Sequence, residues 1–247
     1  MIENTQQTNY VIIASVDKNY LLMFQIWHSQ FKKLKLKTEL VVLTFDDESF
    51  RVINNKKIKC HRVFKTVSKP NDIYVWRLEI IKEYLQQKIN VVHTDLDAFW
   101  FSKKVMNLPN DNFDLQISKG SGTPQNAFKH WGFTMCCGFY ILNSNFNSLR
   151  FIDTWIEKSN NLNHDQKALN EIFLNDNIEW KENTDLNKIG FSKNFNLKIE
   201  VFNTATISRG KEEIDKTKLL IFHPYLSSPT QSEKVSEVKR RLKTLNN

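Results

Sequence analysis

Short runs of almost uninterrupted apolar residues constrain the fold of this chain more than any other feature. Three of them occupy residues 10–16, 39–45 and 91–94, and the less regular segment 58–64 is expected to form a further strand. Strands of this kind are buried on both faces, as in parallel sheets covered by helices. After the first run, residues three or four apart predict a helix, namely Tyr20, Phe24, Trp27, Phe31 and Leu34. Strands that alternate with helices predict an α/β fold with a mostly parallel central sheet flanked by helices.

The helix expected before the last of these strands determines where that strand ends. Asn71 or Asp72 supplies an N-cap, and the helix runs to about Gln87. Its buried side is formed by Val75, Leu78, Ile81 and Leu85. The strand follows directly, so Asp95 and Asp97 come at its C-terminal end. In open α/β sheets, ligands bind at this edge.

The acidic pair indicates a metal site. In an extended chain, side chains two apart point the same way, so Asp95 and Asp97 share a side while Leu96 turns into the core. Carboxylate oxygens suit Mg²⁺ or Mn²⁺, and these ions in turn bind phosphate oxygens. The simpler explanation is a capped turn after a strand. The segment therefore predicts a metal-dependent site for a substrate that carries a diphosphate.

The second half of the chain is less regular. Strands are expected at 113–118, 138–142 and 219–222, a loop at 119–129, a strand or loop at 202–210, and helices at 146–158, 165–174 and 232–245. The last helix is basic, with Val235, Val238 and Leu242 as its apolar positions. Because no linker rich in Pro, Gly or Ser divides the chain, we expect one domain, 1–247. Its first half, about 10–110, ends with the acidic pair, and its second half spans about 111–247.

The positive charge of the chain indicates anionic partners. Its 247 residues carry a net charge of +8, with a pI of about 9.2. Such a surface attracts nucleic acid, acidic lipid headgroups or nucleotide diphosphates, although a solvated Lys-rich face is the simpler explanation. No helix-turn-helix, zinc-finger or RNA-binding aromatic motif is visible in the sequence. We therefore expect no nucleic acid partner, and the basic helix at 232–245 is a candidate for peripheral contact with a membrane.

Cysteine use and the N-terminal residues indicate the compartment. Cys60, Cys136 and Cys137 lack metal-ligand spacing, and reduced thiols in a reducing compartment explain them most simply. Met1–Gln7 is polar and lacks the apolar core of a signal peptide. No run approaches the ~20 apolar residues that span a bilayer. We expect a cytoplasmic protein without a transmembrane segment.

Several landmarks occur together in an order that resembles a known family. They are Arg77 before the key strand, Asp95-Leu96-Asp97, the Gly-aromatic strand Cys137–Leu142, the segment His164–Asn170, and Ile221–Pro224 followed by Lys234. Over roughly residues 10–240, the chain resembles GT-A-fold glycosyltransferases of the nucleotide-diphospho-sugar transferase type, in which the acidic pair is the DxD motif. It departs from them at Cys136 and Cys137, where Asn or Thr is common, and in lacking a glycine between the late His and Lys.

The resemblance implies a reaction and a set of site residues. The enzyme would transfer a sugar from a nucleotide-diphosphate donor to a hydroxyl of a glycan or other acceptor. In this family the donor is commonly a UDP-sugar, and the resemblance implies that the configuration at the anomeric carbon is retained. Manganese, or magnesium, is expected on Asp95, Asp97 and His223. The donor is expected to contact Ser15, Asp17, Arg77, Asp95 and Lys234. The implied catalytic residues are Asp165 and Gln166, which line the sugar pocket.

Simpler explanations exist for these residues and for the function. Asp165 is an obvious N-cap, Arg77 an exposed helix charge, and His223 a core histidine. An alternative function is a phosphatase with an aspartyl-phosphate, but such enzymes place Thr or Val where this chain has Phe99. Another alternative is a non-catalytic basic protein that binds nucleotides or nucleic acid.

Overall fold

The computed structural model describes residues 9–65, 72–210, 214–228 and 230–246, and all structural statements concern these residues. Asn71 and Met1–Gln7, which enter the sequence predictions above, lie outside them. Among the described helices, none combines the length and the apolar content needed to cross a bilayer.

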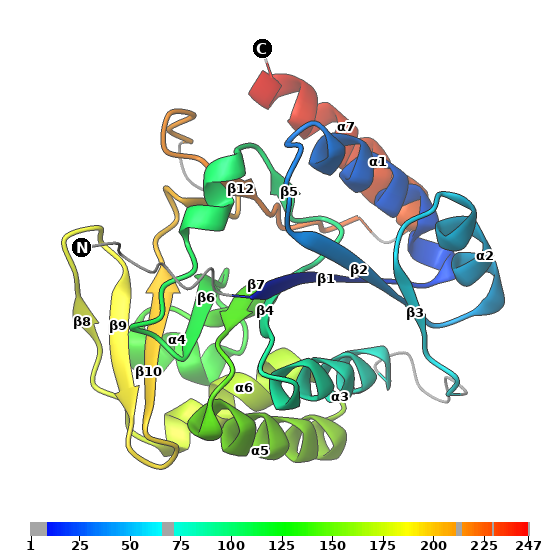
Figure 1. The fold of residues 1–247 in the computed structure, drawn as a ribbon. Helices are drawn as coiled ribbons and strands as arrows, with labels where there is room; N and C mark the ends of the chain where they lie inside the picture. The colour runs from blue at the N-terminus through cyan, green and yellow to red at the C-terminus, as the bar shows by residue number, and fades with distance from the viewer. Residues whose placement is uncertain (1–8, 66–71, 211–213, 229, 247) are drawn as a thin grey trace, which may run out of the picture.

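A large sheet forms the centre of the molecule (Figure 1). From edge to edge, its nine strands are β3 (Cys60–Arg62), β2 (Glu39–Thr44), β1 (Tyr10–Val16), β4 (Asn90–Thr94), β7 (Met135–Leu142), β6 (Leu115–Lys119), β10 (Leu197–Phe202), β9 (Lys188–Ser192) and β8 (Lys181–Glu182). Within the described part of the chain, only β7 and β9 run against the other strands of this sheet. The α/β class with a central sheet is confirmed, and the four apolar segments form β1 to β4.

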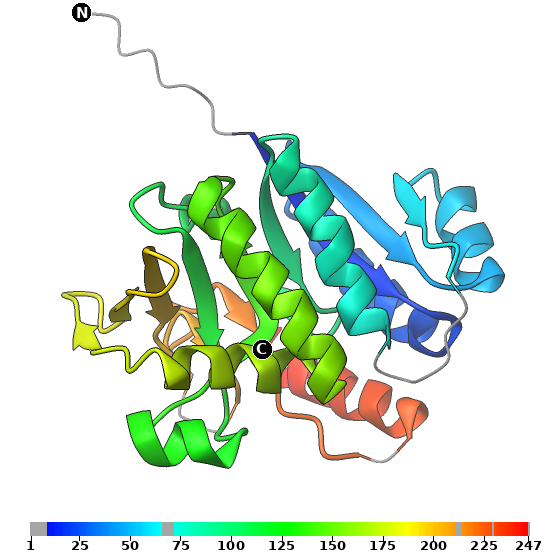
Figure 2. The same cartoon turned by 90° about the horizontal axis from the view of Figure 1, so that it is seen from below.

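Helices cover both faces of this sheet. In Figure 1, α3 (Asp72–Gln86), α5 (Phe146–Leu162) and α6 (Asp165–Asn175) lie below it, and Figure 2 shows α3 and α5 side by side. On the upper face lie α1 (Leu21–Lys32), α2 (Asp47–Asn55) and α7 (Gln231–Asn246). Each set buries its apolar residues in a separate cluster against the strands. Val235 and Val238 of the basic C-terminal helix are buried, as predicted.

A second, three-stranded sheet brings distant segments to the end of β4. It consists of β11 (Ile207–Ser208), β12 (Ile221–Phe222) and β5 (Phe99–Trp100). In the antiparallel pair of β12 and β5, Phe222 lies opposite Phe99. His223 therefore follows β12 at the level of the residues that precede β5, and the pairing carries it to the acidic turn.

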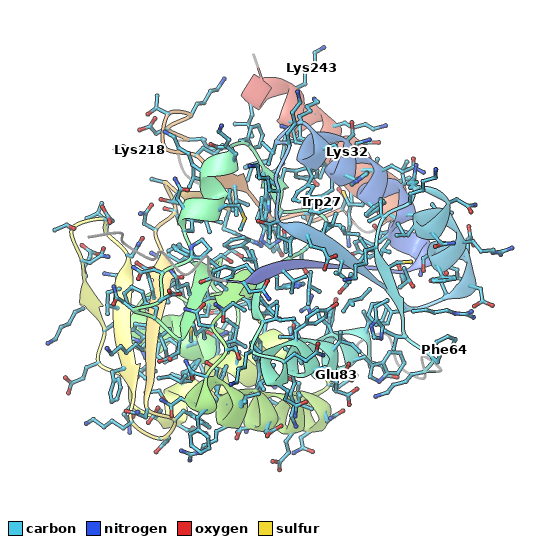
Figure 3. The ribbon with its side chains drawn as sticks, in the orientation of Figure 1. Trp27, Lys32, Phe64, Glu83, Lys218 and Lys243 are labelled. Atoms are coloured by element: carbon cyan, nitrogen blue, oxygen red, sulfur yellow. The ribbon has the colours of Figure 1, made fainter. Side chains whose placement is uncertain are left out.

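Trp27 holds the segment after the acidic pair in place. Its side chain is 1% exposed and lies under α1 in Figure 3, whereas Lys32 and Lys243 are on the outside of their helices. Its Nε1 donates a hydrogen bond to the carbonyl oxygen of Ala98 at 2.9 Å. The ring also stacks on Phe31, with centroids 4.7 Å apart. This buried anchor fixes the backbone that leads into β5.

Some predicted elements were wrong or incomplete. The expected loop 119–129 contains the start of α4 (Gln125–Trp131), which ends at Gly132 with φ 77°. The strand expected at 138–142 begins at Met135 instead. Of the segment 202–210, only β11 and the end of β10 are strands. Helix α2, the β9–β10 hairpin and the short helices η1 (Lys18–Tyr20) and η2 (Lys103–Asn107) were not predicted.

Candidate active site

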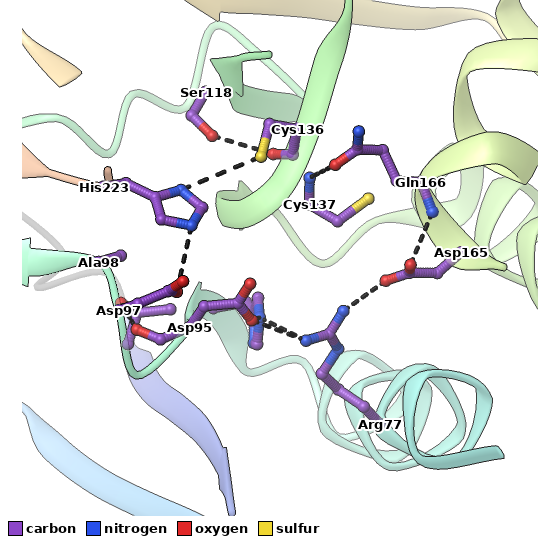
Figure 4. Close-up of polar contacts among 12 residues, drawn as sticks. Arg77, Asp95, Asp97, Ala98, Ser118, Cys136, Cys137, Asp165, Gln166 and His223 are labelled. Carbon is purple, nitrogen blue, oxygen red and sulfur yellow. Dashed lines mark hydrogen bonds and ion pairs between the residues drawn. The ribbon is translucent and has the colours of Figure 1, made fainter. Parts of the chain in front are cut away.

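The acidic pair lies in a turn and not in an extended strand. The amide of Ala98 donates to the carbonyl of Asp95 at 3.2 Å, and the amide of Asp95 donates to Gly138 at 2.7 Å. Leu96 is 3% exposed and packs in the core, as expected. The expectation of an extended pair was wrong, because the chain turns here towards β5. The turn sends Asp95 towards Arg77 and Asp97 towards His223 (Figure 4).

Two side chains of this turn, together with His223 after β12, could hold a metal ion. One ligand atom from each of Asp95, Asp97 and His223 lies within 4.8 Å of the other two. Nε2 of His223 is 3.2 Å from Oδ1 of Asp97. Two carboxylate oxygens and an imidazole nitrogen fit a divalent ion such as Mn²⁺ or Mg²⁺. Gly138 leaves room for the imidazole, since a Cβ there would lie 1.9 Å from Cε1 of His223.

His223 is buried between the carboxylate of Asp97 and the guanidinium of Arg209. Burial and Arg209 lower its pKa, but the carboxylate of Asp97 outweighs them and raises the pKa to about 9. A metal ion would therefore replace a proton on Nε2. On the other side of the ring, Nη1 of Arg209 lies against Nδ1 of His223 and 3.4 Å from Sγ of Cys136. Burial raises the pKa of Cys136, but the charge of Arg209 lowers it to about 7.

A buried guanidinium joins the metal site to the second predicted pair. Arg77 is 3% exposed, so the explanation as an exposed helix charge was wrong. Its Nη1 donates to Oδ1 of Asp95 at 3.0 Å, and its Nη2 forms an ion pair with Asp165. Asp165 is itself 4% exposed, and the N-cap of α6 is His164, so the capping explanation for Asp165 was also wrong.

His93 completes this network. Its Nε2 lies 3.0 Å from Nη1 of Arg77 and 3.2 Å from Oδ1 of Asp95. Burial and the charge of Arg77 lower the pKa of His93 to about 4, so the imidazole is neutral. Burial raises the pKa of Asp95, but the hydrogen bond of His93 and the charge of Arg77 outweigh it and hold that pKa below its ordinary value. Asp95 is therefore ionised and able to accept a cation.

Gln166 lies beside β7, on the far side from His223. Its Oε1 accepts a hydrogen bond from the amide of Cys137 at 3.4 Å, and its Nε2 donates to the carbonyl of Thr123 at 2.8 Å. Asn170, one turn later in α6, clasps Met135 of β7: its Nδ2 and Oδ1 bond the carbonyl and the amide of Met135, each at 2.9 Å. This clasp fixes the start of α6, and with it Asp165 and Gln166, against the strand.

Comparison of the sequence with known protein families identifies the family of this chain. A sequence profile of the nucleotide-diphospho-sugar transferases matches residues 35–226, which is most of the chain. The chain belongs to this family. The expected enzyme class, a nucleotide-sugar-dependent glycosyltransferase, is thereby confirmed, and the phosphatase and the nucleic-acid-binding protein are disfavoured. A comparison with curated proteins found no significant match.

Solved structures show the same fold for the transferase. The galactosyltransferase LgtC, in complex with donor and acceptor sugar analogues, has a TM-score of 0.55 at 12% identity, and 96% of each chain is covered. GlyE of Streptococcus pneumoniae TIGR4, described as a glycosyltransferase, has a TM-score of 0.56 at 11% identity over 96% of this chain and 64% of its own. The bifunctional glycosyltransferase WbbM has 0.58 at 12% identity, over 96% and 52%. At these identities the likeness establishes the GT-A fold.

The remaining predicted residues of the transferase lie around this centre with fewer contacts. Ser15 is the penultimate residue of β1, which pairs with β4, and its Oγ is buried without a hydrogen-bond partner among the described residues. Asp17 accepts a bond from the amide of Tyr20 at 3.0 Å and caps η1, so turn chemistry explains it. Among the described residues, no hydrogen bond or ion pair is found between the side chain of Lys234 on α7 and the site residues. Their roles with the donor stay predictions.

Two site residues were missed from the sequence. His93 had a usable signal, because it lies in β4 only two positions before Asp95, which follows the end of that strand. Arg209 had none, because it is one of 35 basic residues and lies in an irregular segment after β11. Only the pairing of β11 with β12 brings it to His223.

Replacing Asn170 with alanine should destabilise the transferase. The change leaves the buried amide and carbonyl of Met135 without partners, which costs about 2–4 kcal/mol of unfolding free energy. Urea denaturation measures this. Asn147→Ala, which removes a single exposed bond to the carbonyl of Asn196, is the matched control and should cost under about 1 kcal/mol. If both variants lose the same free energy of unfolding, the two bonds of Asn170 to Met135 stabilise the protein no more than an exposed bond does.

Proposed function

We propose that the chain transfers a sugar from a UDP-sugar to a hydroxyl group of a glycan or other acceptor, with a divalent metal ion on Asp95, Asp97 and His223. The observation that carries this proposal is the convergence of these three ligands at the C-terminal edge of the sheet. The family supplies the donor class. Manganese is proposed over magnesium because the set includes a nitrogen.

The proposed reaction moves one glycosyl group. The bond between the anomeric carbon and the β-phosphate oxygen breaks, and the acceptor oxygen bonds to the same carbon. The nucleoside diphosphate leaves and takes up the proton of the acceptor hydroxyl. When bound, the ion would neutralise charge on this diphosphate and stabilise it as a leaving group.

The residues of the chain divide into three proposed roles. Asp95 and Asp97 hold the ion, and Ser15 lies where the nucleoside would bind, at the end of the strand next to β4. Asp165 and Gln166, held at the start of α6, line the sugar side of the site. One comparison structure is described as a glutamine-to-glutamate active-site mutant of LgtC, so a glutamine belongs to the active site of that enzyme. Retention of configuration is proposed from the family resemblance, and nuclear magnetic resonance of the product anomer tests it.

Asp97→Ala tests the metal-dependent binding of the donor. With a UDP or GDP ligand at ~100 times its dissociation constant, the wild type should gain about 2.7 kcal/mol of stability in the presence of Mn²⁺. The variant should lose this gain, because it lacks one ligand of the ion. Thermal unfolding with and without Mn²⁺ measures the difference.

A control and a negative result complete the test. Asp153→Ala removes an exposed carboxylate of α5, far from the acidic turn in sequence and paired with Lys82, and should keep the full gain. If the wild type shows no gain and no sugar release with any UDP- or GDP-sugar, the proposed function is wrong.

A further inference from the structure

Positive charge is concentrated in three segments far apart in the chain. Together they contain ten Lys and Arg residues and no Asp or Glu, and they are 21–38, 98–110 and 238–246. Among the described residues, only one of these ten cations, Arg241, forms an ion pair, with Glu237. On the opposite face of the sheet, by contrast, lysines of α3, α5 and α6 pair with nearby carboxylates. The charge of the three segments is therefore not neutralised within the fold.

The three segments pack together and turn their cations outward. Phe31 of α1 packs on Trp100 of β5, with ring centroids 5.3 Å apart, and β5 leads into η2. Val105 of η2 and Val238 of α7 are buried in the same hydrophobic cluster as these rings. Nine cations are exposed around this cluster and are called the basic surface here: Lys32, Lys33, Lys35, Lys37, Lys103, Lys104, Lys239, Arg240 and Lys243. Lys32 and Lys243 both lie on the upper side of the molecule in Figure 3.

Stabilisation of helix ends accounts for only part of the basic surface. A cation in the last turn of a helix interacts favourably with the helix dipole. Lys32, Lys104 and Lys243 lie in such turns of α1, η2 and α7. The other six cations of the surface lie outside them and have no carboxylate partner among the described residues. Their mutual repulsion would be relieved by an anionic partner.

The side chains around these cations favour a lipid surface over a nucleic acid as that partner. Proteins that bind single-stranded nucleic acids without sequence preference stack the bases on aromatic side chains. In the three segments, which all lie within the described ranges, no Phe, Tyr or Trp is among the exposed residues. Clusters of about four to eight Lys and Arg on an amphipathic helix are typical of sites for anionic lipid headgroups. Helix α7 fits this description, since Val235 and Val238 are buried while Lys239, Arg240 and Lys243 are exposed.

We propose that the basic surface binds the anionic headgroups of a lipid membrane. The apolar side of α7 packs in the core, so this helix contributes charge and does not insert into the bilayer. The contact is therefore peripheral, electrostatic and sensitive to salt. This inference goes beyond the proposed function and does not depend on it, because the contact needs neither a metal ion nor a nucleotide.

Vesicle flotation with the full chain and with the triple variant Lys239→Gln, Arg240→Gln, Lys243→Gln tests the inference. In EDTA, the wild type should bind vesicles made of equal parts phosphatidylcholine and phosphatidylserine, and not vesicles of phosphatidylcholine alone. Each cation near such a surface strengthens binding about fivefold, so the triple variant should bind about 100-fold more weakly. Wild-type binding should also weaken between about 0.1 M and about 1 M salt, where the Debye length falls from about 10 Å to about 3 Å.

A second triple variant is the matched control for net charge. Lys181→Gln, Lys193→Gln, Lys198→Gln removes three exposed lysines from β8, β10 and the turn before β10, and should bind vesicles as the wild type does. Circular dichroism checks the folding of each variant.

A double variant in the first segment tests whether the surface extends beyond α7. Lys32→Gln, Lys37→Gln should weaken binding by about 25-fold. The inference is wrong if this variant or the α7 variant keeps wild-type affinity, or if the control loses as much as the α7 variant. It is also wrong if the wild type binds both kinds of vesicle equally, or binds a single-stranded RNA and no vesicles. None of these outcomes bears on the proposed function, because the assay contains no metal ion or nucleotide.

Discussion

Replacing Gly138 with alanine is expected to remove the metal site while leaving every predicted ligand in the sequence. The new Cβ would lie 1.9 Å from Cε1 and 2.6 Å from Nδ1 of His223, distances that no relaxed structure tolerates. The ring must move away from Asp97, whose Oδ1 now lies 3.2 Å from Nε2. We expect Mn²⁺ affinity to fall by at least about 100-fold, and metal-dependent turnover with it.

The matched control for this prediction is another glycine in the same sheet. Gly190→Ala places a Cβ 2.6 Å from Cγ2 of Ile178 and 2.7 Å from Cζ3 of Trp180. Both variants overpack a buried position and should lose about 1–3 kcal/mol of stability. Only Gly138→Ala should lose Mn²⁺ binding per folded molecule, as measured by titration with circular dichroism as the check of folding. Retained binding in Gly138→Ala would exclude His223 as a ligand.

The sequence predicted those features of the transferase that depend on local pattern. The apolar runs became β1 to β4, and the helix before β4 was predicted to end within one residue of Gln86. Because the strand ends at Thr94, the position of Asp95 at the sheet edge followed from the same pattern. The family landmarks depend on short motifs, which is why the class of enzyme could also be predicted.

The contacts of the site could not be predicted, because they depend on pairing between distant segments. His223 meets Asp97 because β12 pairs with β5, which lies more than a hundred residues earlier in the chain. An exposed helix charge was the simpler explanation for Arg77, because nothing in the local sequence predicts the burial of a guanidinium. Its partner Asp165 is 88 positions away. Side chains alternate along β7, so Cys136 lies towards His223. Cys137 lies on the other side of the strand, where it interacts electrostatically with Asp165 and Arg77.

Arg77→Met is expected to cost more stability than any exposed substitution in this chain. Arg77 and Asp165 are 3% and 4% exposed, so removing the guanidinium leaves a buried carboxylate without its cation. Breaking such a pair costs about 3–5 kcal/mol. Because domains are stable by only about 5–15 kcal/mol, the variant should be close to unfolding at room temperature. Urea denaturation of the two proteins measures the loss.

The double variant distinguishes a lost ion pair from lost packing. Arg77→Met with Asp165→Asn removes both charges, so it should be more stable than Arg77→Met alone by about 1–3 kcal/mol, although both lack the guanidinium. Arg150→Met, an exposed arginine on α5, should change stability by less than about 0.5 kcal/mol. If the double variant is no more stable than the single one, Arg77 supports the core through its packing alone. Recovery would instead show that the loss in Arg77→Met comes from leaving the buried carboxylate of Asp165 without its cation.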